Sequence, residues 1–205
     1  MVATSVDIAN IALAKTGGKQ ITALSDNTAV NVSYDMVLDE VLTDHPWTFA
    51  QKRAALVSTT APTVYTEDGL TYLFTKPTDV LKINFVNSSS AILKLEATGI
   101  LCNESALSIL YTARITDVAT YPQSFVAALA TKLAAQVCFS VTNDMKKTEA
   151  LMQEYENMAL PHAMSVDSQQ GSSDWIQQDE WENARLSGSG WMSAKRGADT
   201  WIPYT

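Results

Sequence analysis

The run SFVAALATKLAAQVCFSV, residues 124–141, is the most apolar stretch of the chain and sets the plan for the rest. Its apolar residues recur at helical spacing: Val126, Leu129, Ala130, Leu133 and Val137. Pro122 lies at the start of this run and is expected at the first helical position, N1, where proline is common. Lys132 and Gln136 interrupt the run, which is shorter than the roughly 20 residues that a bilayer requires. We therefore predict a core helix here rather than a membrane span.

Two helices are expected before this run. Ser5 is predicted to cap the first, which continues to Lys15 and stops at Gly17-Gly18, residues that favour a helix C-terminus. Its buried face is expected to contain Ile8, Ile11 and Ala12. The second helix is expected to end at about His45, because Pro46 follows. Its apolar stripe is longer: Val30, Tyr34, Val37, Leu38, Val41 and Leu42.

A fourth helix is expected after the apolar run, with Asn143 as its cap and Pro161 kinking or ending it. Its predicted face consists of Leu151, Met152, Tyr155, Met158 and Ala159. Met145, Met152, Met158 and Met164 are interpreted as gap-filling residues in or beside this helix. The two helix pairs thus frame the middle of the chain.

Between the helix pairs the period changes from helical to alternating. Leu81, Ile83 and Phe85 alternate with polar residues, and turn-formers such as Glu67-Asp68-Gly69 separate the runs. Strands are predicted over residues 48–57, 70–74, 81–85, 93–95 and 106–115. The middle third is therefore interpreted as a small antiparallel β unit.

Neither helix pair can cover its own apolar stripe, so the two pairs must meet and leave the β unit projecting. The predicted fold class is α+β: a four-helix bundle formed by the N- and C-terminal helix pairs, an inserted antiparallel β domain and an extended C-terminal arm. The expected boundaries are residues 1–46 plus 120–170 for the bundle, 47–119 for the β domain and 171–205 for the arm.

The formal charge of -8 and the pI near 4.7 argue against DNA or RNA as a tightly held ligand, because phosphate affinity comes mainly from Lys and Arg. An acidic wall repels phosphate and is compatible with a channel that DNA slides through, but many acidic proteins are simply soluble. Cys102 and Cys138 lie far apart without a CxxC or nearby His pattern, and are expected to be buried free thiols. No metal site, cofactor or signal peptide is expected.

The last 35 residues, 171–205, have no sustained period yet contain four of the five tryptophans: Trp175, Trp181, Trp191 and Trp201. Each Trp contributes roughly 4–6 kcal/mol when fully buried. Ordering the chain costs about 1–2 kcal/mol per residue. The anchors alone do not offset that cost, so we predict a segment that is loose in the free subunit and orders on a partner.

Several short motifs, taken in order, carry a resemblance to a known family. They are NIALAKTGGK (10–19), ITAL (21–24), DHPWTFAQKRA (44–54), LYTARITD (110–117), FVAAL (125–129) and KTEALMQEY (147–155). Their sequence over roughly residues 8 to 160 resembles the tail tubular protein A family of short-tailed phages. The segment from Trp175 to Leu186 also looks like the Trp-containing extensions of some of these adaptors.

The resemblance implies a structural virion protein without enzymatic activity. It implies a subunit of a dodecameric ring that joins the portal protein above to the tail nozzle, tubular protein B or tail hub below, while DNA passes through the lumen without specific binding. The chain would be made in the bacterial cytoplasm and act at the head–tail interface of the virion, with no membrane partner. The expected portal-binding arm contains Trp175, Ile176, Trp181, Arg185, Leu186, Trp191 and Trp201.

Other interpretations rest on weaker patterns. His45 and His162 have no partner residues at catalytic spacing, and Gly17-Gly18-Lys19 follows a helix rather than the strand of a phosphate loop. Glu149 and Glu156 are seven residues apart and could supply the paired carboxylates that glycoside hydrolysis needs. Because of these two carboxylates, the alternative hypothesis is a virion-associated peptidoglycan hydrolase. A plain interaction module outside any virus is the third hypothesis.

Overall fold

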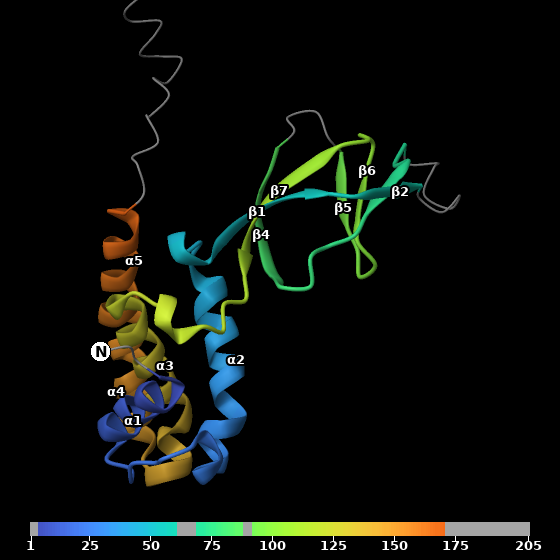
Figure 1. Ribbon diagram of the computed structural model, residues 1–205. Helices are drawn as coiled ribbons and strands as arrows, with labels where there is room; N and C mark the ends of the chain where they lie inside the picture. Colours follow the sequence, from blue (N-terminus) through green and yellow to red (C-terminus); the bar gives the residue numbers. More distant parts are fainter. Residues whose placement is uncertain (1–3, 61–68, 88–91, 171–205) are drawn as a thin grey trace, which may run out of the picture. The chain divides into compact units, whose positions relative to one another are not determined.

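The computed structural model describes residues 4–60, 69–87 and 92–170 (Figure 1). Over this part of the chain the fold is mixed α+β, with four helices and two small antiparallel sheets. The chain divides into two units, residues 1–170 and 171–205, and all of these helices and strands belong to the first unit.

The helices follow the expected order. They are α1 (Ser5–Thr16), α2 (Thr28–Asp44), α3 (Gln123–Thr142) and a last helix made of α4 (Met145–Glu154), a π-helical turn η5 (Tyr155–Ala159) and α5 (Leu160–Ser168). Three short 3-10 turns join them to their neighbours: η1 (Leu24–Asp26), η2 (Thr48–Ala50) and η4 (Val118–Thr120).

The helix ends correct three expectations. The cap of α1 is Thr4 rather than Ser5: the Thr4 hydroxyl accepts the Asp7 N–H, and the Asp7 carboxylate accepts the Thr4 N–H. Pro122 is the N-cap of α3, one position before the expected N1. Asn143 ends α3 with a left-handed φ of 54°, and Asp144 caps α4 instead. Gly17, with φ 77°, ends α1 as predicted.

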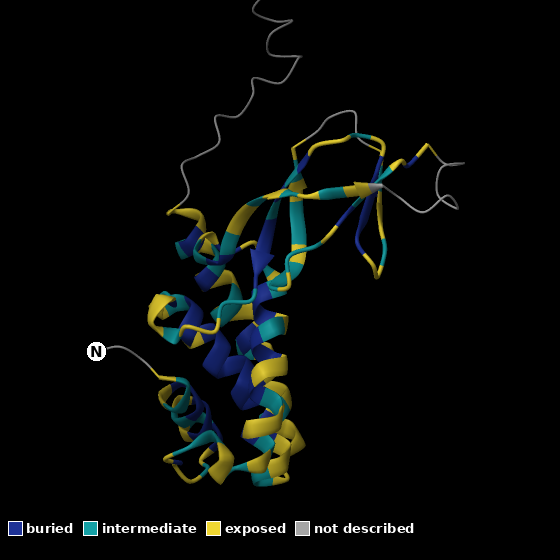
Figure 2. Cartoon of the chain, turned by 45° about the vertical axis from the view of Figure 1, so that its right-hand side comes forward, coloured by how far each residue is buried: buried dark blue, intermediate teal, exposed yellow. Residues whose placement is uncertain are grey.

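Helix α3 is the core helix that the sequence predicts, and it packs against α1, α2, α4 and α5. All five residues of its predicted stripe are buried, as are all six of α2. In length and composition α3 would suit a membrane span, yet 67% of its most apolar window is buried inside the protein. Figure 2 shows buried residues concentrated on the helices' facing sides. On α1 the prediction is wrong for Ile11, which is exposed.

The last helix presents a different face from the predicted one. Leu151 and Tyr155 are buried, but Met152 and Met158 are exposed, and so is Met145, which is not a gap-filler either. The helix does not end at Pro161, because the π turn precedes it: the Leu160 N–H donates to the Tyr155 carbonyl, five residues back. The extra residue in that turn shifts the buried side to Ala163 and Asp167.

Seven strands form the two sheets of the described β unit. In sheet A, β1 (Gln51–Leu56), β7 (Leu107–Ala113) and β4 (Val80–Val86) lie in that order. In sheet B the order is β2 (Ser58–Thr60), β3 (Tyr72–Phe74), β6 (Ile100–Cys102) and β5 (Leu93–Leu95). All strand pairs are antiparallel. A second apolar core, which includes Phe74, Ile100 and Ile109, lies within this unit.

The five predicted strands are confirmed, although β1 begins only at Gln51, after η2. Two further strands, β2 and β6, are not predicted by the sequence pattern. Residues of β6 are all buried, so no alternation marks it. It starts beside Gly99, where an added Cβ would lie 2.4 Å from the Phe74 carbonyl oxygen, so the close approach of β3 requires glycine.

Candidate functional site

The residues that the sequence assigns to a portal-binding arm lie outside the described residues. They are Trp175, Ile176, Trp181, Arg185, Leu186, Trp191 and Trp201. The expectation that this segment orders only on a partner falls on the same residues. The part of the chain that the structure describes offers two other features, a packed joint and a surface groove.

The joint between α2 and β1 holds the longest of the quoted motifs, and a buried carboxylate organises it. Asp167, only 4% exposed, accepts the Thr48 N–H with both oxygens at 3.1 Å and the Thr48 hydroxyl at 2.5 Å. The Nε2 atom of His45, the residue that ends α2, lies 3.3 Å from the same carboxylate. His45 therefore makes a structural contact between α2 and α5.

A second contact crosses the same joint, and here the carboxylate belongs to α2 and the donor to the last helix. The Tyr155 hydroxyl of the π turn donates to Asp44 in the last turn of α2, at 2.7 Å. Burial and this carboxylate raise the pKa of Tyr155. The two carboxylates thus bind α2 to the last helix reciprocally, one contributed by each side.

Aromatic packing fills the space beneath the joint. Trp47 is 1% exposed and donates its indole N–H to the Val41 carbonyl at 2.8 Å. Its ring meets Phe125 of α3 edge-on, with centroids 5.1 Å apart, and Phe49 meets Phe125 at 4.9 Å. Such edge-to-face pairs stabilise beyond their buried area. The HPWTF segment is therefore a packed structural joint.

Lys132 is the buried cation of the helical part. It is 7% exposed, its Nζ lies 2.9 Å from Glu40 of α2, and it stands 4.6 Å above the ring of Tyr155. A buried ammonium requires such partners, because desolvation penalises an isolated charge. Lys132 thus joins α3 to α2 and to the π turn.

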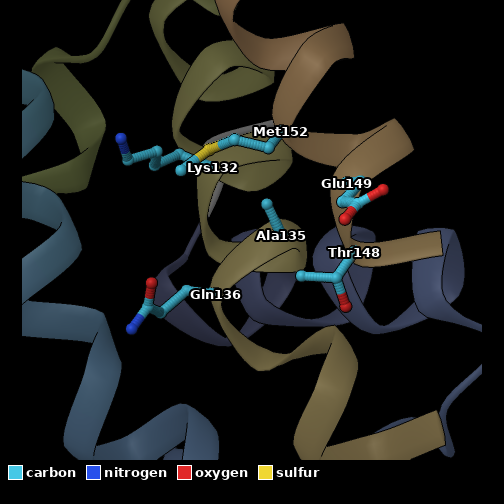
Figure 3. Close-up of a pocket in the computed structure, with 6 residues that line it drawn as sticks. All are labelled: Lys132, Ala135, Gln136, Thr148, Glu149 and Met152. Atoms are coloured by element: carbon cyan, nitrogen blue, oxygen red, sulfur yellow. The ribbon is translucent and has the colours of Figure 1, made fainter. Parts of the chain in front are cut away.

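A surface cavity of about 270 Å³ begins at Lys132 and follows α3 toward its C-terminal end. Lys132, Ala135 and Gln136 form its floor on α3, and Thr148, Glu149 and Met152 come from α4 (Figure 3). Lys132 and Gln136 point toward α2. We call this feature the α3 groove, defined by the six residues just named.

Exposed apolar side chains accompany the α3 groove on all three helices. Met36 precedes Glu40 by one turn on α2, and Phe139 follows Ala135 by one turn on α3. Met36 is 55% exposed, Phe139 49% and Met152 37%. An apolar groove between helices that contains a methionine, here Met152, is typical of a surface that receives another protein.

The acidic, histidine and cysteine side chains of the described residues form no metal-binding cluster: no group of three or more of them is placed to hold a metal ion. Glu149 and Glu156 are both exposed, and Glu154 is bound to Lys15 at 2.6 Å. Cys102 and Cys138 are buried and free, as predicted.

No protein-family model matches the chain, and no curated protein matches it.

The sequence pattern predicts neither the burial of Asp167 nor the α3 groove. Asp167 follows Val166 in a stretch with no helical stripe, so no pattern marks it as buried. For the groove a signal exists: Met152 and Phe139 are apolar residues beside polar neighbours on otherwise well-patterned helices. Interpreting Met152 as a gap-filling residue hides that signal.

Proposed function

We propose that this chain is a head-to-tail adaptor subunit of a short-tailed phage, a structural protein of the virion that links the portal to the tail nozzle or tail hub. Copies of it form a ring, a dodecamer by the family's pattern, and DNA passes through the lumen without specific binding. The proposal rests on the ordered motifs between residues 8 and 160, which resemble the tail tubular protein A family.

The finer architecture belongs to the same proposal. The four helices act as one bundle, and residues 171–205 act as an arm that extends to the portal, with its tryptophans as anchors. Aromatic anchors of this kind dominate binding energy in protein interfaces. Many copies in a ring act together, because each engaged arm raises the effective concentration of the next.

The joint at residues 44–48 is the structural observation that supports the proposal beside the motifs. Within the motif DHPWTFAQKRA, the Asp44, His45 and Thr48 side chains bind the last helix. Two reciprocal carboxylates and a buried Trp make the connection between helices and β1 stiff. A stiff joint suits a subunit whose task is to transmit position between two neighbours.

The charge distribution supports the conduit part of the proposal. The chain's net charge is -8. A lumen wall with this sign repels phosphate, so DNA would slide past it rather than be held. The carboxylates of helix α2 add little to this effect, because Asp35 and Asp39 are paired with Arg114 and Glu40 is paired with Lys132.

The test is gradient co-sedimentation of the full chain with the portal ring from the same source genome, followed by negative-stain imaging. A second ring stacked beneath the portal is the expected result. If the chain stays at the top of the gradient while the portal sediments intact, the adaptor function is wrong. As a control, the portal ring is sedimented with bovine serum albumin, which shows whether an unrelated protein co-sediments with it.

A further inference from the structure

The helices and the β unit each bury an apolar core of their own. In the described part of the chain, the core of the helices and the core around Phe74, Ile100 and Ile109 share no buried residue. Two partly buried side chains connect them: Leu81 of β4 packs against the core of the helices, and Ile115 packs against both cores. When so small an apolar contact joins two bodies, relative motion between them is the default expectation.

The chain passes between the helices and the β unit twice, and the two crossings are held differently. The first is the joint at which Asp167 and Trp47 anchor the start of the β unit in the helices. The second follows the end of β7 and begins at Arg114. The Arg114 backbone belongs to the β unit, because its N–H donates to the Asp79 carbonyl at 2.8 Å. Its side chain instead reaches α2.

The Arg114 side chain binds α2 through two ion pairs. Its Nε lies 2.6 Å from Asp39, and its Nη2 lies 3.4 Å from Asp35, one turn earlier on the helix. One guanidinium shared by two carboxylates is a small network, the arrangement in which partly exposed ion pairs contribute measurably. The Lys82 ammonium adds a weaker contact, a hydrogen bond of 3.3 Å to the Thr43 carbonyl of α2. The side chains of Arg114 and Asp39 are 36% and 38% exposed, so dissolved salt screens their attraction.

We propose that Arg114 is a latch that fixes the direction of the β unit relative to α2. While Arg114 is paired with Asp39 and Asp35, the β unit is held against the helix. When these pairs are broken, the β unit swings about the two crossings, and both apolar cores stay intact. The joint fixes where the β unit leaves the helices, and the latch fixes the direction in which it points. The latch lies within one chain and does not depend on the proposed ring.

Distances between two nitroxide labels on the full chain, measured by double electron–electron resonance, test the latch. One label is attached at Ile11→Cys on α1 and the other at Leu95→Cys on β5, and both positions are exposed. The native thiols, Cys102 and Cys138, are buried and do not take up the label. A second pair of labels, at Val57→Cys and Leu95→Cys, lies within the β unit and reports on its internal structure.

The parent should give a single narrow distance distribution for the Ile11 and Leu95 labels. We expect Arg114→Gln to widen this distribution at least about twofold, because the apolar contact that remains allows several directions of the β unit. Lys52→Gln is the matched control. It breaks the 2.7 Å pair with Asp79, whose partners both belong to the β unit, and should leave the width unchanged. In about 1 M sodium chloride the parent should widen too, whereas Arg114→Gln should not change further.

Equal widths for the parent and Arg114→Gln would overturn the proposal, because the packing of Leu81 and Ile115 would then be enough to hold the β unit. Widening of the distribution between the Val57 and Leu95 labels by the same factor would also overturn it, since the change would then lie inside the β unit.

Discussion

The carboxylate of Asp167 accepts hydrogen bonds from both the backbone N–H and the hydroxyl of Thr48, although 119 residues separate the two in sequence. Thr48 opens the path from α2 into β1, and Asp167 lies in the last turn of α5. The entrance to the β unit and the end of the last described helix therefore share one side chain.

Replacing this carboxylate should destabilise the protein strongly. For Asp167→Ala we expect the free energy of unfolding to fall by about 3 kcal/mol, because Thr48 and His45 lose the buried acceptor that they share. Asp167→Asn keeps an acceptor oxygen and should cost less. Urea denaturation measures both. The adjacent exposed residue supplies the control: Ser168→Ala should change stability by less than about 0.5 kcal/mol. Similar losses for Ala at 167 and 168 would contradict the role of this carboxylate.

Two buried tyrosines should respond to Phe in opposite ways. The Tyr34 hydroxyl is the buried side-chain polar atom without a partner in the described part of the chain, whereas the Tyr155 hydroxyl donates to Asp44. Tyr34→Phe is expected to be neutral or stabilising by up to about 1 kcal/mol, since it removes an unsatisfied group. Tyr155→Phe should cost about 2 kcal/mol, because its partner is charged. Thermal and urea unfolding of the two variants measure these changes in the free energy of unfolding. A larger loss of stability for Tyr34→Phe than for Tyr155→Phe would contradict the prediction.

The capping box of α1 should make stability depend on pH in acid. The Thr4 backbone N–H, and then the Thr4 hydroxyl, hold the pKa of Asp7 below its ordinary value. A lowered folded pKa means that the contribution is present above the ordinary value near pH 4 and is lost as pH falls through the folded value. The difference in urea midpoint between the parent and Asp7→Asn should therefore shrink between about pH 5 and about pH 2. Ser5→Ala, which leaves the box intact, is the control, and a constant difference would contradict the prediction.

Truncation after Gln170 separates the proposed arm from the described unit. Because the described residues of the helices form an apolar core among themselves, the shortened chain should keep its thermal midpoint within a few degrees. The adaptor proposal expects it to lose portal attachment in the gradient assay. Single Trp→Ala changes at Trp175 and Trp181 should weaken attachment by about 2 kcal/mol each if they are anchors. A plain interaction module would instead keep its binding after truncation.

A turbidity assay on purified peptidoglycan addresses the hydrolase alternative. We expect no clearing by the full chain at micromolar concentration. Clearing that is abolished by Glu149→Gln or Glu156→Gln, with the fold intact by circular dichroism, would reverse the assignment. Lysozyme under the same conditions provides the positive control.

The helices could be predicted because their faces are set by long apolar stripes. Every residue of the α2 stripe is buried, since a repeat of this length defines a face whatever lies opposite. The prediction failed on the last helix, where Met152 and Met158 are exposed. An α-helical wheel does not foresee the π turn, so it places Met158 on the buried side. Met152 precedes the turn, which does not explain its exposure.

Tertiary contacts explain the remaining differences. Strand β6 has no alternating pattern because both of its faces are covered, and a run of three buried residues is too short to identify. The burial of Asp167 depends on a partner 119 residues away, and no local rule predicts it. The α3 groove lies between α3 and α4, so it is a property of their packing rather than of any single stripe.

The π turn between Tyr155 and Ala159 also sets which changes of length the chain can tolerate. The turn holds one residue more than a regular α-helix, and each residue of an α-helix corresponds to about 100° of rotation. Deleting one residue from it would leave an ordinary, well-formed helix. That helix would turn Asp167 about a quarter of a circle away from Thr48, so an alteration that improves local geometry would open the joint. Insertions and deletions here should therefore be far more damaging than substitutions.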